Sequence, residues 1–328
     1  MKRRELIAFA GIGAALRSFP VAAQAPAKRV RLGILQGGAR ADVEKFSDQP
    51  FLTELARLGY VEGNNLIVER RFAEGRLERL PALAAEIIAF QPDLIFAPPA
   101  PAAAAAKALT TTIPIVFCFV NEPVALGFAQ SLARPGGNLT GVSNFSVEIA
   151  GKRIELLKEL VPGLTRLAAW YNPQAVSDAV EVPAVEQAAA RLKMQFLAVK
   201  ANVPTEYDAA AETTRGWGAH GLYVSANPSA YANRKQIVDL AAALKLPTTY
   251  FHAGFVADGG LMSYATNFAD LARRAAGYAV KIFQGANPAD LPIEQPTRLD
   301  LTINLKTAQA LGLAIPQSLL LRATELIE

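Results

Sequence analysis

Polar side chains follow the apolar, strand-like runs of this chain at the points where those runs end. The residues concerned are Gln36, Asn121, Glu122, Asn172, Ser225 and Asn227. Because the carboxyl ends of parallel strands meet at one edge of an open α/β sheet, where ligands bind, we expect these side chains to converge. Amides and hydroxyls there would hydrogen-bond a small solute, and Glu122 would pair with an ammonium or hydroxyl group. Alternatively, such residues only end strands through turns or interact with a helix dipole.

Further candidates for solute contact flank the same edge. They are Gly37, Pro98, Ala100, Ser143, Asn144, Tyr250, Phe251 and Tyr264. The glycine lets the backbone pass close to a ligand, and the three aromatic residues could form an apolar wall. Buried aromatic residues also commonly belong to the core, and Ser143 and Asn144 also fit a structural turn.

Patterns typical of catalytic and metal sites are absent from the sequence. His220 and His252 are the two histidines, and neither an H-x-x-x-H nor a C-x-x-C spacing occurs. No G-x-S-x-G nucleophile motif is present. We therefore expect neither an enzyme nor a metal site nor a cofactor. A hydrolase that uses Glu122 or His252 is the enzyme alternative.

The elements that would position the candidates alternate between strand and helix. In the first half we expect strands at Val30–Leu35, Asn65–Phe72, Leu94–Ala97, Ile113–Val120 and Leu139–Val142, and helices at Glu44–Leu58, Leu77–Phe90, Val124–Leu132 and an alanine-rich stretch that ends at Leu109. Residues 113–120 are apolar at nearly every position, as in a parallel strand covered on both faces. This order predicts a doubly wound parallel sheet.

The second half repeats the same order of elements. We expect strands at Arg166–Tyr171, Met194–Val199, Gly221–Val224, Pro247–Phe251 and Gly260–Tyr264, and helices at Ile149–Leu160, Val182–Leu192, Tyr207–Trp217 and Ala230–Leu244. The tail adds a helix at Phe268–Gln284, a strand at Arg298–Leu305 and short helices at Leu305–Leu311 and Ser318–Ile327. The fold class predicted is α/β, with two doubly wound lobes.

A tail of one long helix and one strand is best placed by returning it across both lobes. The backbone would then cross near Val142, Ser263 and Thr297. We expect one lobe from residues 28–142 plus about 265–296, and the other from 143–264 plus about 297–328. Several crossings form a hinge, and hinged lobes close over a ligand in the manner of a Venus flytrap.

The start of the chain has the layout of a secretory signal peptide over residues 1–25, with a basic start, an apolar run and Ala23-Gln24-Ala25 as a cleavage site. Arg3-Arg4 also permits twin-arginine export. Without residues 1–25 the chain keeps 29 basic and 28 acidic residues, so nucleic-acid binding loses its support. Cys118 is the one cysteine, which excludes an internal disulfide.

Several long motifs resemble a family of ABC-importer substrate-binding proteins. They are SLARPGGNLTG at residues 131–141, GGLMSY at 259–264, DLARRAA at 270–276, PADLPIEQP at 288–296 and INLKTA at 303–308. They occur in collinear order across the chain after the leader. The resemblance implies a type I periplasmic-binding fold. The better-understood members are similar to tryptophan- and tyrosine-type binders.

The chain departs from the family pattern at two places in the expected site. Glu122 stands where the family usually has Asp, so the carboxylate reaches one methylene further. Residues 97–101 (APPAP) stand where the family tends to have Gly-Thr or Gly-Ser. A hydroxyl donor is missing and each proline lacks an N–H, which makes an α-carboxylate contact at this corner less favourable.

The resemblance and the residues together predict a periplasmic binding protein of an ABC importer. It would hold a small aromatic or apolar solute, amino-acid-like or a carboxylate, between closing lobes. The expected partners are that solute and an ABC permease in the inner membrane, with no nucleic acid, and the protein would be a monomer. A ligand-sensing ectodomain that feeds a membrane receptor is the other alternative.

Overall fold

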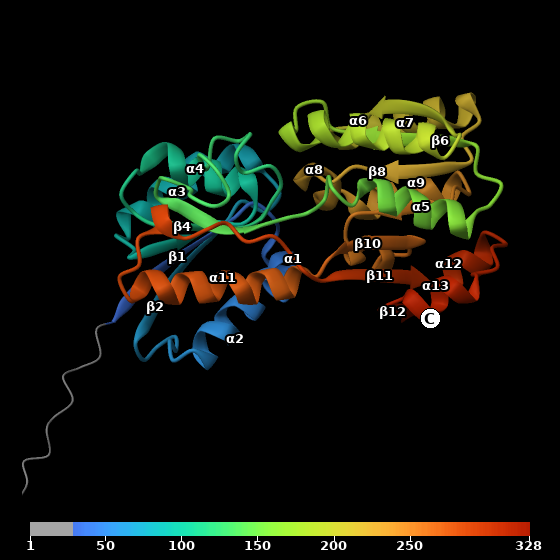
Figure 1. The fold of residues 1–328 in the computed structure, drawn as a ribbon. Helices are drawn as coiled ribbons and strands as arrows, with labels where there is room; N and C mark the ends of the chain where they lie inside the picture. The colour runs from blue at the N-terminus through green and yellow to red at the C-terminus, as the bar shows by residue number, and fades with distance from the viewer. Residues whose placement is uncertain (1–28) are drawn as a thin grey trace, which may run out of the picture.

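The computed structural model describes residues 29–328, so the predicted leader lies outside the described residues. Two α/β lobes stand side by side and are linked by extended backbone (Figure 1). Within the described residues, none of the helices combines the length and apolar character needed to cross a lipid bilayer.

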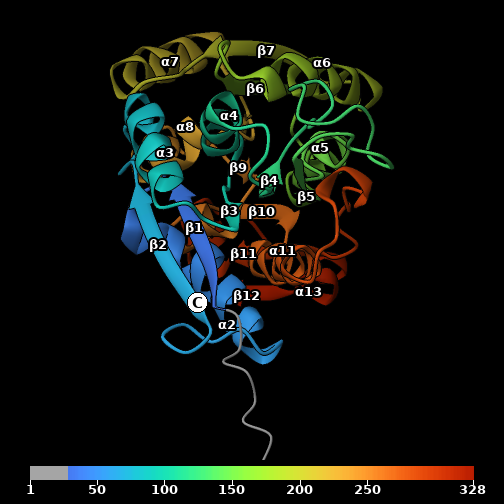
Figure 2. The ribbon, with the colours of Figure 1, turned by 90° about the vertical axis from the view of Figure 1, so that its left-hand side faces the viewer.

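The first lobe is built on a five-stranded parallel sheet in the order β2-β1-β3-β4-β5. Its strands are β1 (Val30–Gln36), β2 (Leu66–Phe72), β3 (Leu94–Phe96), β4 (Ile115–Val120) and β5 (Leu139–Ser143). Its helices are α1 (Arg40–Val43), η1 (Glu44–Asp48), α2 (Gln49–Arg57), η2 (Leu77–Arg79), α3 (Leu80–Ala89), α4 (Ala100–Leu109), α11 (Phe268–Phe283) and η3 (Pro288–Asp290). Figure 2 shows α3 and α4 on one side of this sheet and α2 and α11 on the other.

The second lobe is built on a seven-stranded sheet in the order β12-β11-β10-β9-β8-β6-β7, in which β10 and β11 are antiparallel. Its strands are β6 (Arg166–Tyr171), β7 (Gln195–Lys200), β8 (Gly221–Val224), β9 (Thr248–Tyr250), β10 (Met262–Thr266), β11 (Leu299–Asn304) and β12 (Glu325–Ile327). Its helices are α5 (Ala150–Leu160), α6 (Val176–Arg191), α7 (Pro204–Trp217), α8 (Pro228–Ala232), α9 (Arg234–Ala243), α10 (Ala253–Ala257), α12 (Leu305–Ala310) and α13 (Gln317–Arg322). The predicted fold class, two doubly wound lobes, is confirmed.

Strand β4 shows why the first half folds as a covered parallel sheet. All of its residues are buried. Val116 and Cys118 belong to the core under α2 and α11, whereas Ile115 and Phe117 belong to the core under α3 and α4. Because side chains alternate along a strand, a run that is apolar throughout fits a sheet that is buried on both faces.

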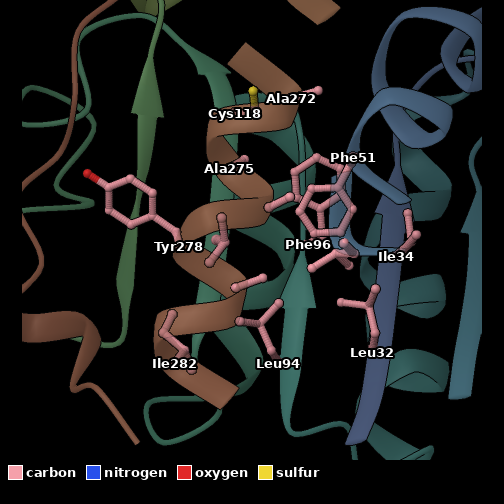
Figure 3. Packing of buried hydrophobic residues seen from close by; sticks show 14 of the residues in the cluster. Leu32, Ile34, Phe51, Leu94, Phe96, Cys118, Ala272, Ala275, Tyr278 and Ile282 are labelled. Atoms are coloured by element: carbon pink, nitrogen blue, oxygen red, sulfur yellow. The ribbon is translucent and has the colours of Figure 1, made fainter. Parts of the chain in front are cut away.

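Helix α11 joins the first lobe although it comes from the last quarter of the sequence. Ala272, Ala275 and Ala279 are fully buried, and such small side chains let the helix lie close to the sheet. Figure 3 shows α11 above the strands, beside the stacked rings of Phe51 and Phe96, whose centroids are 3.9 Å apart. This burial fixes α11 to the first lobe.

The backbone crosses between the lobes after β5, between β10 and α11, and between η3 and β11. Arg274 of α11 steadies the last crossing, because its guanidinium donates to Thr297 Oγ1 at 2.6 Å and lies 3.5 Å from the Glu294 carboxylate. The DLARRAA motif therefore packs its alanines on the sheet and uses one arginine to hold the third crossing.

Some expected elements differ from the structure. The helix expected at Val124–Leu132 is wrong: residues 123–127 form turns. Positive φ angles of 51° at Glu122 and 67° at Gly127 bend the chain out of a helical path. Residues 325–327, expected to be helical, form the edge strand β12. The helix expected at residues 44–58 begins earlier, at Arg40, and contains a π-helical segment at residues 44–48.

Candidate functional site

A cavity of about 260 Å³ lies between the two lobes. The first lobe contributes the ends of β1, β4 and β5 through Gln36, Asn121 and Asn144. The second lobe contributes the segment after β8, which includes Asn227, and Phe251 after β9. The cavity therefore lies at the carboxyl edges of both sheets, where open α/β folds bind ligands.

One wall of the cavity is aromatic and is built from both lobes. Phe46 on η1 lies 5.5 Å from Tyr231 of the second lobe and 5.9 Å from Phe268, measured between ring centroids. Phe119 stacks on Phe268 at 4.5 Å with an interplanar angle of 9°. His252 supports this wall from behind, 4.3 Å from Phe268. We call Phe46, Phe119, Tyr231 and Phe268 the aromatic wall.

A β-bulge places Phe119 in the aromatic wall. The register between β4 and β5 shifts between Cys118 and Val120, and Phe119 has a φ of 61°. A bulge reorients a side chain that regular alternation would send elsewhere, and positive φ is unusual and costly for a large side chain. The strained backbone thus turns a residue of β4 toward the cavity.

His252 is neutral where it supports the wall. Burial, followed by the charge of Arg234, lowers the pKa of the imidazole to about 3. Its Nδ1 accepts a hydrogen bond of 2.8 Å from the Gly254 N–H, so the ring proton is on Nε2. The ring therefore packs as an uncharged aromatic group.

A buried polar cluster supports Gln36 at the floor of the cavity. The Gln36 amide nitrogen donates to Ser47 Oγ at 3.0 Å and to the carboxylate of Asp48. Burial raises the pKa of Asp48 to about 6. Because the amide nitrogen is occupied, the group that Gln36 has free for a solute is its carbonyl oxygen.

A second buried network connects the cavity to the segments that cross between the lobes. Asp178 Oδ2 accepts from Ser225 Oγ at 2.6 Å and from Asn227 Nδ2 at 3.0 Å. The neighbouring Glu181 accepts from the Ala226 N–H at 3.0 Å and pairs with Arg153 at 3.1 Å. Burial raises the pKa of Glu181 to about 7 even beside this arginine.

Arg153 lies at the end of this network beside the crossing segments and is almost completely buried, with 1% of its surface exposed. Its guanidinium donates to the Ser146 carbonyl at 3.2 Å in the first crossing and to the Tyr264 carbonyl at 2.8 Å in β10, just before the second. It also donates to the Tyr223 hydroxyl at 2.9 Å. The Arg153 side chain therefore links the first two crossing segments to the part of the second lobe that borders the cavity.

Direct contacts hold the lobes together around the cavity. The guanidinium of Arg234 on α9 donates to both carboxylate oxygens of Asp42 on α1, at 2.9 and 3.2 Å. Asn121 Nδ2 donates to the Ala226 carbonyl at 3.4 Å. These contacts and the aromatic wall join the two lobes, so the structure is that of a closed cleft.

Six of the residues predicted from sequence line the cavity. They are Gln36, Gly37, Asn121, Asn144, Asn227 and Phe251. All six lie at or just beyond strand ends, as the topological argument requires. The cavity gathers them from β1, β4, β5, β8 and β9.

The other predicted residues lie outside the cavity lining. They are Pro98, Ala100, Glu122, Ser143, Asn172, Ser225, Tyr250 and Tyr264. Pro98 is buried and Ala100 starts α4, so it is the intervening Pro99 that reaches the cavity. Glu122 belongs to the turn after β4, where its carbonyl accepts from Leu126 N–H at 3.0 Å.

The remaining members of that group have structural partners. Ser143 N–H donates to the Glu294 carbonyl at 2.8 Å, and Asn172 Oδ1 closes a turn by accepting from Gln174 N–H at 2.8 Å. Ser225 is bonded to Asp178, and Tyr250 stacks on Phe255 at 4.6 Å inside the core. Tyr264 is half-buried against the core of the second lobe.

The sequence interpretation missed the aromatic wall and two acids, Asp42 and Glu74, that also line the cavity. Phe46 lies within a helix and Phe119 within a strand, so neither stands at a strand end. The signal for Phe268 was its place at the start of a helix directly after a lobe crossing. The signal for Tyr231 was weaker, because it lies in a short helix after β8.

The SLARPGGNLTG motif anchors the segment before the third crossing rather than lining the cavity. Gly136 N–H donates to the Ala289 carbonyl at 3.1 Å, and Thr140 Oγ1 donates to the Leu291 carbonyl at 2.7 Å. Gly141, with a φ of 151°, lies so close to β4 that a Cβ would be 2.1 Å from the Phe117 carbonyl oxygen. The motif therefore binds the PADLPIEQP segment and holds the third crossing against β5.

Comparison with known families decides the class of the protein. The family described as ABC transporter substrate binding protein matches residues 44–327. The chain belongs to this family. The resemblance found in the sequence motifs is thereby confirmed, and the protein is a solute-binding component of an ABC transporter rather than an enzyme.

Individual relatives agree with the fold of this substrate-binding protein. A tyrosine-binding protein of Clostridioides difficile is 25% identical over 287 residues, which cover 87% of this chain and 82% of the relative. A conserved domain protein from Vibrio cholerae has a similar structure, with a TM-score of 0.84, 25% identity and coverage of 91% of this chain and 100% of that chain. The ABC domain from Streptococcus pneumonia in complex with L-Trp also matches with a TM-score of 0.84, at 23% identity over 92% of this chain and 100% of that chain.

Proposed function

We propose that this chain captures one small aromatic solute in the interlobe cavity and presents it to an ABC permease. The observation that carries the proposal is the aromatic wall, to which both lobes contribute rings. Aromatic pairs in offset or edge-to-face geometry contribute about 0.5–1.5 kcal/mol beyond their buried area. A solute ring inserted there would contact both lobes at once, so binding would favour closure.

The relatives support this class of solute. One relative is a tyrosine-binding protein, and a protein of similar fold is solved in complex with L-Trp. The cavity of about 260 Å³ suits one small molecule. We propose direct solute contacts for the aromatic wall and for the six predicted residues that line the cavity.

The proposed setting is the periplasm, reached through the predicted leader, with the protein working as a monomer beside a permease of the inner membrane. The proposed lobes are residues 28–142 plus about 265–296, and 143–264 plus about 297–328. Support for this division comes from α11, which packs in the first lobe, and from β11, which pairs with β10 in the second.

A thermal-shift screen of aromatic and aliphatic solutes, followed by calorimetry of the hits, tests the proposal. A solute that binds only the folded protein raises the melting temperature. We expect aromatic solutes to stabilise the protein and the Phe119→Ala variant to lose roughly tenfold or more in affinity. Stabilisation by aliphatic solutes or sugars alone would refute the proposal.

A further inference from the structure

The charges around the cavity are unfavourable for an anionic solute. Two carboxylates, Asp42 and Glu74, line it, and no lysine, arginine or histidine does so among residues 29–328. Arg234 neutralises Asp42 from outside the lining. Glu74 is exposed at the cavity. Fixed charges on the walls of a cleft set the local potential, so the net contribution here favours a neutral or cationic group.

The start of α1, beside the cavity, offers little to an anion, although a helix N-terminus normally attracts one. At the start of α1, Arg40 N–H donates to the Glu74 carboxylate at 3.3 Å. Glu74 therefore occupies the position that a solute carboxylate would take. The Gly75 N–H donates to the Gly37 carbonyl at 3.0 Å, which keeps Glu74 at the Gln36 end of the cavity.

The start of α4 is similarly poor in donors. The prolines at 98, 99 and 101 have no N–H. The N–H groups of Ala102 and Ala103 both donate to the Pro99 carbonyl, at 3.0 and 3.2 Å. Within residues 29–328, Ala100 has the one N–H of this segment that finds no partner. This corner therefore lacks the several convergent donors that a carboxylate needs.

The same holds for the start of α8 in the second lobe. Pro228 has no N–H, and Ala230 N–H is capped by Asn227 Oδ1 at 2.8 Å. The Tyr231 N–H donates to the Asn227 carbonyl at 3.2 Å. Of the N–H groups at the start of α8, the one on Ser229 remains to face the cavity.

The amide side chains at the cavity have mostly committed their donors as well. Gln36 and Asn227 donate to buried acids, as described above. Asn233 Nδ2 donates to the Ser229 carbonyl at 2.9 Å, which leaves its Oδ1 as an acceptor. Asn144, whose Oδ1 accepts from Thr266 Oγ1 at 2.8 Å, keeps its Nδ2 as a donor. Among these amide side chains, free acceptors therefore outnumber free donors.

We infer that the solute is an arylalkyl amine without a free carboxylate, with its ring in the aromatic wall and its ammonium at the Gln36 and Glu74 end. This inference rests on the proposed function, because it names the head group of the proposed aromatic solute. An ammonium has three donors and no acceptor, which matches a cavity rich in acceptors. The inference departs from the expectation from sequence, in which an amino-acid-like or carboxylate solute was predicted.

Matched pairs of compounds test the head group while the ring stays constant. Calorimetry would compare tyramine with tyrosine, tryptamine with tryptophan, and phenethylamine with 3-phenylpropanoate. We expect each amine to bind roughly tenfold or more tightly than its partner. Equal or tighter binding of the amino acids or of 3-phenylpropanoate overturns this inference and leaves the proposed aromatic site intact. Binding of aliphatic solutes alone overturns both.

Two exposed acids of the same loop region provide a matched pair of variants. Glu74→Gln removes the carboxylate at the cavity, and Glu78→Gln removes an exposed carboxylate that does not line it. We expect Glu74→Gln to reduce the ratio of amine affinity to amino-acid affinity by roughly threefold, and added salt to reduce it in the wild type. Glu78→Gln should leave the ratio unchanged. An unchanged ratio in Glu74→Gln contradicts the assigned place of the ammonium.

Discussion

The ion pair between Arg234 and Asp42 allows closure of the cleft to be tested at a contact between the lobes, and the Arg234 guanidinium also lies 4.8 Å from the centroid of the Tyr231 ring. The guanidinium donates to both carboxylate oxygens across the lobes, and the two side chains are 18% and 38% exposed. An exposed ion pair contributes about 0–1 kcal/mol. The bidentate geometry places this pair near the upper end, at about 1 kcal/mol.

Arg234→Met should therefore shift the equilibrium between closed and open forms toward the open form by about fivefold. Where the free protein is mostly open, the full loss of closure free energy appears in the binding of the solute. The dissociation constant of the solute then rises by about fivefold. Calorimetry with the tightest solute of the screen measures this change. Small-angle X-ray scattering of the same samples reports whether the lobes still close at saturating solute.

A matched variant separates the interlobe ion pair from the ion pair that the arginine makes within the second lobe. Arg234 also pairs with Asp258 within the second lobe at 2.9 Å. Asp258→Asn removes only that pair, and we expect the dissociation constant to change by less than about twofold. If Arg234→Met binds the solute as tightly as the wild type, or if both variants lose the same affinity, the interlobe pair does not stabilise closure.

Two further predictions concern stability. Gly141→Ala should lower the free energy of unfolding by at least about 3 kcal/mol, because the new Cβ would meet the Phe117 carbonyl. Gly137→Ala, where a Cβ would point into open space, should lower it by less than about 1 kcal/mol. Urea denaturation of both variants measures the difference. Asp48 has a pKa raised to about 6 by burial, so the folded state holds this proton more tightly than the unfolded state, and stability is lost as the pH rises from about 4 to about 6. Asp48→Asn, which keeps an acceptor for Gln36, should raise the melting temperature at pH 8, with a gain that fades toward pH 4; a gain independent of pH would contradict the assignment.

The sequence predicted the lobes well because hydrophobic periodicity reports burial directly. Residues 166–171 and 221–224 were assigned as strands with the bounds that the structure has. The segment after β4 was not predicted, because its apolar residues pack on the core through turns rather than through a helix. Edge strand β12 was missed because two of its three residues are exposed and carry no periodic signal.

The site was predicted only where topology decides it. Gln36, Asn121 and Asn227 lie at strand ends, and the parallel sheets bring such ends together. Phe119 could not be found in this way, because its orientation depends on a bulge that no pattern in the strand announces. Phe46 could not be found from the sequence either, because its place opposite Tyr231 depends on the contact between the two lobes.

The attachment of α11 to the first lobe has a consequence for biosynthesis. Residues 30–143 leave the ribosome early, yet their core remains incomplete until residues 268–283 follow, because Leu271, Ala275 and Ile282 fill one side of that sheet. The intervening strands β6 to β9 are contiguous in the chain and can assemble first. The first sheet is therefore covered only after strands β6 to β10 of the second lobe have been translated, and a chain truncated before residue 268 would leave one face of its first sheet uncovered.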